Sequence, residues 1–451
     1  MPDNRLTPTN PPLPTKAGDR RHWYGLAGAS RALAIASAAR GVDRPSVVVT
    51  ASSHDAQQLE AALAFFADGT LPVQVMPDWE TLPYDVFSPH QDIVSRRLRT
   101  LHELSAMGRG ILIVPVSTLM QRIAPPDFLA GRVISLTEGQ TLDLDAMRER
   151  LERAGYRRVA EVMEHGEFAV RGAIMDLYAM GSERPVRIDL FDDEIDSLRL
   201  FDPETQRSED RIERLELLPA REFPTGEEGI RRFRQGFRAE FEGDPNASVV
   251  YREVSEGRMP NGIEYYLPLF FEETATLFDY LPAGVVAFRV GDVDDQLDDD
   301  WAQINHRYEQ RRHDRERPLL APARLYLSPD DTRQVLNRMP QVVVFPEEIE
   351  PPGSGRDARF EVTPLPELRS SHEAAAPLSR LQSWLSGFDG RVLFSAETAG
   401  RREAMLERLR TADVRPRTVA GWGTFLKQDA DVAITVAPLE DGAIRDRKSV
   451  V

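Results

Sequence analysis

The sequence contains no cysteine, which excludes disulfide bonds and thiolate zinc sites throughout its 451 residues. This absence fits the reducing cytoplasm, where we expect the protein to reside. Long apolar runs are also lacking: no stretch approaches the roughly 20 residues that a membrane-spanning helix needs, so we expect no membrane contact. The amino terminus has no apolar segment typical of a signal peptide, and its prolines and polar residues predict a disordered tail over residues 1–19.

Positive charge is in short supply. The chain has 56 Lys and Arg against 73 Asp and Glu, a formal net charge of −17. Because duplex DNA is a dense polyanion whose binders usually display basic surfaces, this balance disfavours a free-standing DNA-binding role, although a local basic patch could survive. The acidic run D-V-D-D-Q-L-D-D-D at 292–300 is most simply a solvated loop or the start of a helix, and its spacing does not require Mg²⁺.

The strand and helix signals change along the chain in a way that indicates several domains, as its length predicts. Residues 20–132 alternate strand and helix signals, which predicts a parallel sheet covered on both faces. An antiparallel pattern follows and indicates an inserted α+β domain, before mixed signals resume with a charged helix over 300–317. The predicted divisions are a tail (1–19), a first domain (20–132), the inserted domain (133–217), a return to the first domain (218–345), a proline-rich linker (346–377) and a small α/β domain, truncated inside a further strand (378–451).

Residues 161–201 carry the most informative pattern, a short antiparallel meander. Val186 and every second residue after it are apolar and should face the core, whereas Arg187 and Phe191 share the opposite face with Asp189. An arginine and an aromatic residue on one polar face are typical of a protein-binding hot spot. The alternative is that Phe191 closes the strand end beneath a loop or a neighbouring domain.

Three long motifs make the chain recognisable: M-E-H-G-E-F-A-V-R-G (163–172), F-D-D-E-I-D-S-L-R-L-F-D (191–202) and P-D-W-E-T-L-P-Y-D-V-F-S-P-H (77–90). Over most of residues 20–345 the sequence resembles the bacterial transcription-repair coupling factors, the Mfd family, and more distantly the excision-repair helicase UvrB; the remaining residues resemble the family weakly. The resemblance implies an α/β multidomain fold, with a degenerate P-loop-NTPase-like parallel-sheet domain, an inserted α+β antiparallel domain and a small α/β domain.

The phosphate-binding loop that the resemblance to UvrB leads us to expect is degenerate. A P-loop needs G-x-x-x-x-G-K-[S/T], whose amides, lysine and hydroxyl hold phosphates and Mg²⁺. In the matching segment (24–36), Gly28 remains, but Ser30 stands for the last glycine, Arg31 for the lysine and Ala32 for the hydroxyl residue. A metal ligand is therefore lost, and a side chain lies where the backbone must approach phosphate. Residual anion binding is the most that we expect of this degenerate nucleotide site.

A second element of the helicase site is absent as well. In UvrB a strand ending in Asp-Glu follows a segment like L-F-D-Y-L-P, which is present here at 277–282. The ungapped positions of the acidic pair carry Phe288 and Arg289 instead. We therefore expect no catalytic residues, no metal site and no cofactor in this sequence. The resemblance implies ATP and Mg²⁺ only for a C-terminal translocase that this sequence does not contain.

The remaining function implied by the resemblance is recruitment. The inserted domain of UvrB docks on UvrA, and the matching module of the Mfd family binds UvrA by mimicry of UvrB. Carried over motif by motif, the contact residues are Arg171 in A-V-R-G, Arg187 in P-V-R-I-D and Phe191 in D-L-F-D-D. RNA polymerase and DNA are expected to bind the C-terminal part of such proteins.

Two alternatives to recruitment remain at this stage. The same face could act as an intramolecular clamp that holds a C-terminal translocase inactive. The first domain could instead be a divergent nucleotide-dependent DNA-remodelling enzyme, which the degenerate loop argues against.

Overall fold

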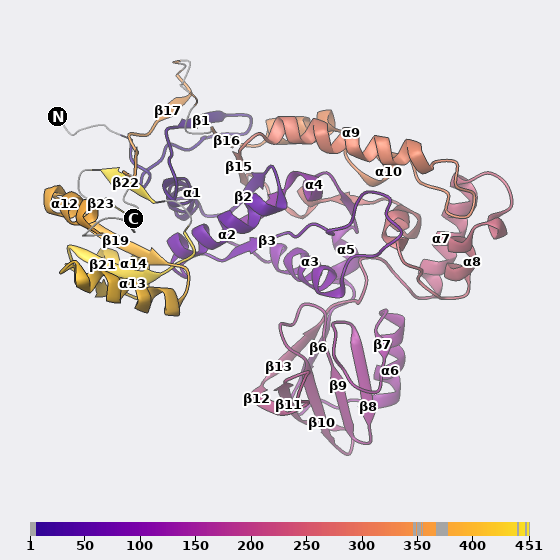
Figure 1. The fold of residues 1–451 in the computed structure, drawn as a ribbon. Coiled ribbons are helices and arrows are strands. Elements are labelled where there is room, and N and C mark those ends of the chain that lie inside the picture. Colours follow the sequence, from indigo (N-terminus) through magenta and orange to yellow (C-terminus); the bar gives the residue numbers. More distant parts are fainter. Residues whose placement is uncertain are drawn as a thin grey trace.

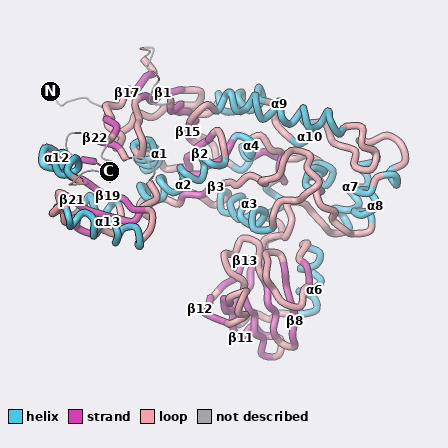
Figure 2. The backbone as a smooth tube through the Cα atoms, in the orientation of Figure 1, coloured by secondary structure: helices cyan, strands magenta, loops and turns pink. Residues whose placement is uncertain are grey.

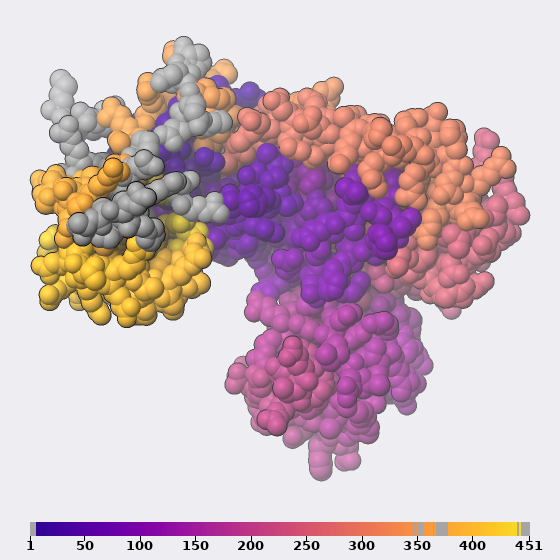
Figure 3. Space-filling view, in the orientation of Figure 1, coloured from indigo at the N-terminus to yellow at the C-terminus, as the bar shows by residue number. Residues whose placement is uncertain are grey.

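The computed structural model describes residues 6–345, 349, 353, 355–366, 378–439, 442–446 and 449–450. An elongated body carries a separate domain on one side and a small domain at one end (Figure 1). The space-filling view shows the side domain projecting from the body (Figure 3). Within the described residues, no helix combines the length and apolar character needed to cross a bilayer.

A seven-stranded sheet, whose strands pair in parallel, forms the centre of the body, in the order β17-β1-β16-β15-β2-β4-β3. Every residue of β2, β4 and β15 is buried, as expected for strands covered on both faces. Its strands are β1 (Arg20–Tyr24), β2 (Pro45–Thr50), β3 (Val73–Val75), β4 (Gly110–Pro115), β15 (Val286–Val290), β16 (Gln341–Val344) and β17 (Asp357–Arg359).

Helices cover both faces of this sheet. Alternate residues of β2 enter different cores: Val47 and Val49 join one buried cluster, and Val48 joins the other. The covering helices are α1 (Ser30–Arg40), α2 (Ser53–Ala67), α3 (Gln91–Leu104), α4 (Val116–Leu119), α5 (Pro126–Ala130), α9 (Val293–Arg311) and α11 (Pro329–Arg338). The short α10 (Pro322–Leu325) packs on α9 instead.

A largely helical lobe forms the end of the body opposite the small domain (Figure 2). Its own core is rich in aromatic side chains, including Phe233 and Phe237, which α7 turns toward the η2 segment. The elements are α7 (Glu227–Glu240), η1 (Pro245–Ala247), α8 (Val249–Ser255), η2 (Ile263–Phe270) and η3 (Leu277–Tyr280), with a short pair between β5 (Arg122–Ile123) and β14 (Ala275–Thr276).

The projecting domain is a six-stranded sheet in the order β12-β11-β10-β9-β8-β7, with helix α6 (Leu144–Arg153) packed on one face. The chain leads into it through β6 (Ile134–Thr137) and leaves through β13 (Arg214–Leu217), and these two strands pair antiparallel. Its other strands are β7 (Arg157–Arg158), β8 (Glu167–Arg171), β9 (Ile174–Leu177), β10 (Val186–Phe191), β11 (Glu194–Phe201) and β12 (Ser208–Ile212).

The small domain has a third sheet, in the order β18-β22-β23-β19-β21-β20. Strands β19 and β21 form a parallel pair within this sheet, as expected for the predicted α/β domain. Its elements are β18 (Thr363–Pro364), α12 (Ser379–Gly387), β19 (Arg391–Ala396), α13 (Ala399–Thr411), β20 (Arg417–Thr418), α14 (Trp422–Lys427), β21 (Val432–Val436), β22 (Ala443–Asp446) and β23 (Ser449–Val450).

Three expectations differ from the structure. The helix predicted over 300–317 spans Val293–Arg311, because the acidic run supplies its first turns, where carboxylates favour the helix dipole. Residues 6–19 of the predicted tail instead pack on the body: Pro12 accepts a hydrogen bond of 3.1 Å from the Trp23 indole, and residues 1–5 lie outside the described part. The predicted linker contributes β17 to the edge of the large sheet, while much of 346–377 lies outside the described residues.

A buried ion pair anchors the chain to the body just after it leaves the projecting domain. Arg97 of α3 is 0% exposed and donates to Glu222, which is 4% exposed, at 2.7 Å. Arg97→Ala leaves this carboxylate buried and unpaired, so the free energy of unfolding should fall by about 3–5 kcal/mol in urea titrations. Arg99→Ala, on the same helix, breaks only exposed pairs and should cost no more than about 1 kcal/mol. Equal losses in the two variants would contradict the assignment.

Candidate partner interface

Two hairpin turns bring the predicted contact residues to one end of the projecting domain. Arg171 ends β8 just before Gly172, whose φ of +62° allows the tight turn into β9. Phe191 ends β10 just before Asp192, whose φ is +56°. The amide of Leu190 donates to the carbonyl of Ala173 at 3.0 Å, so the two turns lie side by side.

Phe191 projects into solvent, with 74% of its surface exposed. Within the described residues, no loop or neighbouring domain covers this ring, contrary to the alternative in which Phe191 closes the strand end. The alternation predicted for this strand is confirmed: Val186 and Ile188 are buried, whereas Arg187 lies on the other face. An aromatic ring this exposed at a turn is free to be buried by a partner.

A buried carboxylate organises the arginines of this face. Asp176 of β9 is 1% exposed and lies directly opposite Arg187 in the strand register. Arg187 binds it with two hydrogen bonds, from Nε to Oδ1 at 2.7 Å and from Nη2 to Oδ2 at 3.0 Å. These bonds raise the pKa of Arg187. Arg171 donates to the same carboxylate, so one buried Asp serves both arginines.

The two arginines differ in what they can offer a partner. The side chain of Arg187 is only 17% exposed and also contacts Gln206, Ser208 and the ring of Phe201. The side chain of Arg171 is 49% exposed, and Asp176 is its one ion-pair partner within the described residues. Arg171 is therefore the arginine with donors left for an incoming acceptor, while Arg187 is held mainly by its own domain.

Sequence reasoning missed both Asp176 and a row of arginines across three neighbouring strands. Arg187, Arg199 and Arg211 lie directly opposite one another on β10, β11 and β12. Arg211 is paired with Glu138, whereas the side chain of Arg199 forms no hydrogen bond or ion pair within the described residues. Like charges in register repel, so this face should favour an acidic partner. The strand register was the signal that could have found the row.

The degenerate nucleotide site forms a cavity of about 690 Å³ at the start of α1. Gly28 has a φ of +47°, and the Ser30 hydroxyl donates to the carbonyl of Ala27 at 2.6 Å. Arg31 and Ala32 line the cavity together with carboxylates from α2 and from the start of α9. Those carboxylates belong to Asp55, Asp292, Asp295 and Asp299, and they outnumber the single guanidinium, which opposes phosphate binding.

The strand expected to carry a helicase acidic pair has buried, non-acidic side chains at those two positions. Phe288 is fully buried in the core, and Arg289 is 5% exposed and paired with Asp294. These two side chains supply no oxygen ligand for a metal ion. Within the described residues, no group of three or more His, Cys, Asp and Glu side chains is arranged to hold one.

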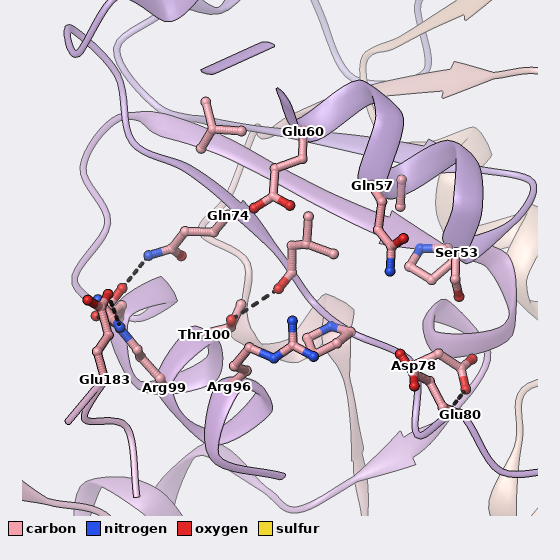
Figure 4. Close-up of a pocket in the computed structure, with 16 residues that line it drawn as sticks. Ser53, Gln57, Glu60, Gln74, Asp78, Glu80, Arg96, Arg99, Thr100 and Glu183 are labelled. Carbon is pink, nitrogen blue, oxygen red and sulfur yellow. Dashed lines mark hydrogen bonds and ion pairs between the residues drawn. The ribbon is translucent and has the colours of Figure 1, made fainter. Parts of the chain in front are cut away.

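A smaller pocket of about 280 Å³ lies where the projecting domain meets α3 (Figure 4). Arg99 points toward Glu183 of that domain and pairs with it at 3.0 Å, and with Glu103 at 2.9 Å. Burial raises the pKa of Glu60 on the opposite wall. Five carboxylates and two arginines are among the residues that line the pocket, which places no nucleophile beside a base. Its pair between Arg99 and Glu183 joins the body to the projecting domain.

The same junction is braced on its other side. His165 contacts Asp92 at 2.6 Å and the carbonyl of Ser182 at 2.8 Å, and the amide of Gly181 donates to Ser95 at 2.8 Å. His165 is thus a structural side chain between the domains. The two hairpin turns therefore lie at the end of the projecting domain that is farther from the body (Figure 1). Backbone hydrogen bonds from residues 139–142 hold the turn at 193–195 there.

We predict that Asp176 holds this face together. Asp176→Asn keeps the shape but removes the charge that two arginines share, so the free energy of unfolding should fall by about 3 kcal/mol in urea titrations. Asp189→Asn, on the same face, keeps its acceptor for Ser197 and should cost less than about 1 kcal/mol. If the two variants were equally stable, the organising role of Asp176 would be refuted.

Comparison with known proteins gives two family matches. The model described as the UvrB interaction domain matches residues 134–223, and the one described as the MFD, D3 domain matches residues 384–451. The first match contains the whole arginine face and Phe191.

Several curated relatives also match. The transcription-repair-coupling factor of Escherichia coli K12 is 44% identical over 408 residues, covering 90% of this chain and 35% of that protein. Its namesake from Haemophilus influenzae Rd is 41% identical over 437 residues, covering 96% of this chain and 37% of that protein. The one from Myxococcus xanthus is 32% identical over 336 residues, covering 71% and 28%. The chain spans roughly a third of the length of these relatives.

Proposed function

The chain belongs to the transcription-repair-coupling factor family, and we propose that this part of such a protein recruits UvrA to stalled transcription rather than performing catalysis. The observation that carries the proposal is Phe191, an exposed aromatic ring beside an arginine-lined face inside the match to the UvrB interaction domain. By presenting a surface similar to the one with which UvrB binds UvrA, the projecting domain would bring this damage-recognition protein to the site where transcription has stopped.

Phe191 and the arginines would contribute to binding in different ways. Burying the ring of Phe191 supplies on the order of 1.5–3 kcal/mol, and Arg171 has donors for a carboxylate of the partner. Arg187 is already immobilised by Asp176, so little side-chain entropy is lost when a partner docks against it. Arg199, which forms no ion pair within the described residues, adds positive charge that would steer an acidic surface toward the face.

An intramolecular clamp is the second candidate, and the same exposed ring favours it. In a full-length relative, Phe191 could be covered by another part of the chain instead of UvrA, and both events could use one surface in turn. The remainder of such a protein would carry RNA-polymerase binding and ATP-dependent movement on DNA. An enzymatic role for the first domain is disfavoured by the acidic lining of the cavity around Arg31.

Binding of UvrA tests the recruitment proposal directly. We expect the purified chain to bind UvrA in calorimetric or anisotropy titrations, and Phe191→Ala to weaken binding about thirtyfold or more, since loss of a hot-spot side chain costs about 2 kcal/mol or more. Arg171→Ala should weaken binding and also reduce its dependence on salt.

Phe87→Ala is the matched control, because that ring is 64% exposed but belongs to the body of the molecule. It should bind UvrA normally. No binding by the unmodified chain would refute recruitment as proposed and shift weight to the clamp, which a pull-down with the remainder of a full-length relative would then detect.

The non-catalytic part of the proposal has its own test. Because four carboxylates face one guanidinium in the cavity at α1, titration with a fluorescent ATP analogue and Mg²⁺ should give a Kd no tighter than about 1 mM. Phosphate release should stay at background with and without DNA. Saturable micromolar binding that Arg31→Ala abolishes would establish a working nucleotide site and overturn this part.

A further inference from the structure

One face of helix α7 carries three arginines that the proposed function does not use. Arg231, Arg234 and Arg238 are spaced three and four residues apart, so they lie on one side of the helix, and all three are exposed. The opposite side of α7 packs Phe233 and Phe237 into the aromatic core. The arginine face therefore points away from the core of the lobe.

These three side chains have no acidic partners. None of them forms an ion pair with a carboxylate within the described residues, although Arg232 on the same helix pairs with both Glu228 and Glu272. Three uncompensated cations within two turns repel one another. In a chain with a net charge of −17, acidic side chains to neutralise them are plentiful, so the lack of pairing is a local property of this face.

The arginines line a groove of about 510 Å³ between α7 and α8. Gln235 and Ser255 also line it, and the Ser255 hydroxyl is buried without a hydrogen-bond partner in the described structure. Glu227 is the acidic residue of the lining. Below the arginines, Tyr251 contacts Arg234 at 3.5 Å and lies 5.6 Å from the Arg238 guanidinium. Burial alone would raise the pKa of Tyr251, but the two arginines outweigh it and lower that pKa.

The character of the groove distinguishes between kinds of ligand. Protein-binding hot spots need large exposed apolar anchors, and none of the exposed large hydrophobic side chains of the described residues belongs to α7 or α8. Guanidinium groups match phosphate oxygens in shape and charge. Arg231 and Arg238 are about 10 Å apart along the helix axis, enough to follow more than one phosphate of a strand.

We propose that the groove between α7 and α8 binds the phosphate backbone of nucleic acid, through Arg231, Arg234 and Arg238. The site lies in the helical lobe at one end of the body, whereas the partner face lies on the projecting domain (Figures 1 and 3). The binding reads no bases, because phosphate contacts position a protein on nucleic acid without specifying sequence. It goes beyond UvrA recruitment and does not depend on it.

The test measures anisotropy of labelled DNA of roughly 20 nucleotides per strand, single-stranded and duplex, with the complete 451-residue chain. We expect weak binding at low salt, with log K falling against log salt with a slope of roughly −2 to −3. The triple variant Arg231→Ala, Arg234→Ala, Arg238→Ala should bind at least about tenfold more weakly and lose most of that slope. Arg232→Ala, on the same helix, should bind as the unmodified chain does.

Circular dichroism and a urea titration of both variants verify that the lobe is folded. Three results would overturn the proposal: DNA binding unchanged in the folded triple variant, equal loss in Arg232→Ala, or no binding by the unmodified chain at low salt. Displacement of the DNA by an acidic peptide at lower concentration than by unlabelled DNA would also overturn it and identify the groove as a protein site. Equal binding of scrambled sequences supports it.

Discussion

The buried carboxylate of Glu222 is the group on which the arrangement of the domains depends. It follows the last strand of the projecting domain and accepts hydrogen bonds from Arg97 of α3 and from the Trp79 indole, at 2.7 and 3.0 Å. Because a buried charge is tolerated only when it is paired, the chain must pass beside Arg97 when it returns from the projecting domain to the body. The contacts of His165 and Gly181 with the body then fix the angle at which the domain projects.

Asp176 repeats the same principle at the surface. It too is a buried carboxylate paired with arginine, but the pairing extends outward to a side chain that is half exposed. In such a binding face the arginines are preorganised: the buried carboxylate fixes their positions before any partner binds. The cavity at α1 has the opposite character, since its four carboxylates outnumber its one guanidinium, and the two regions of the molecule suit very different ligands.

The pattern of the sequence was sufficient for the elements and faces that depend on periodicity. Alternation placed Val186 inward and Arg187 outward, and the strand and helix signals of 20–132 predicted a parallel sheet, but they did not reveal its strands β1, β16 and β17. Whether Phe191 is covered depends on distant segments, so two outcomes remained open until the structure resolved them. Asp176 was not predicted because a single aspartate in a strand has the same sequence pattern as a solvated side chain. The proline content of residues 6–19 wrongly predicted disorder, whereas the carbonyl of Pro12 accepts a hydrogen bond from the Trp23 indole.

The antiparallel pairing of β6 with β13 has a consequence for how the molecule could be rebuilt. Ile134 lies opposite Leu217, so the two ends of the projecting domain are adjacent, although its buried side chains belong to a cluster that continues into the body. A unit whose ends meet can be excised with a short bridge, or transplanted into another host loop, without stretching either chain. The domain is in that sense an insertion that a protein engineer could remove or replace at a single site in the chain.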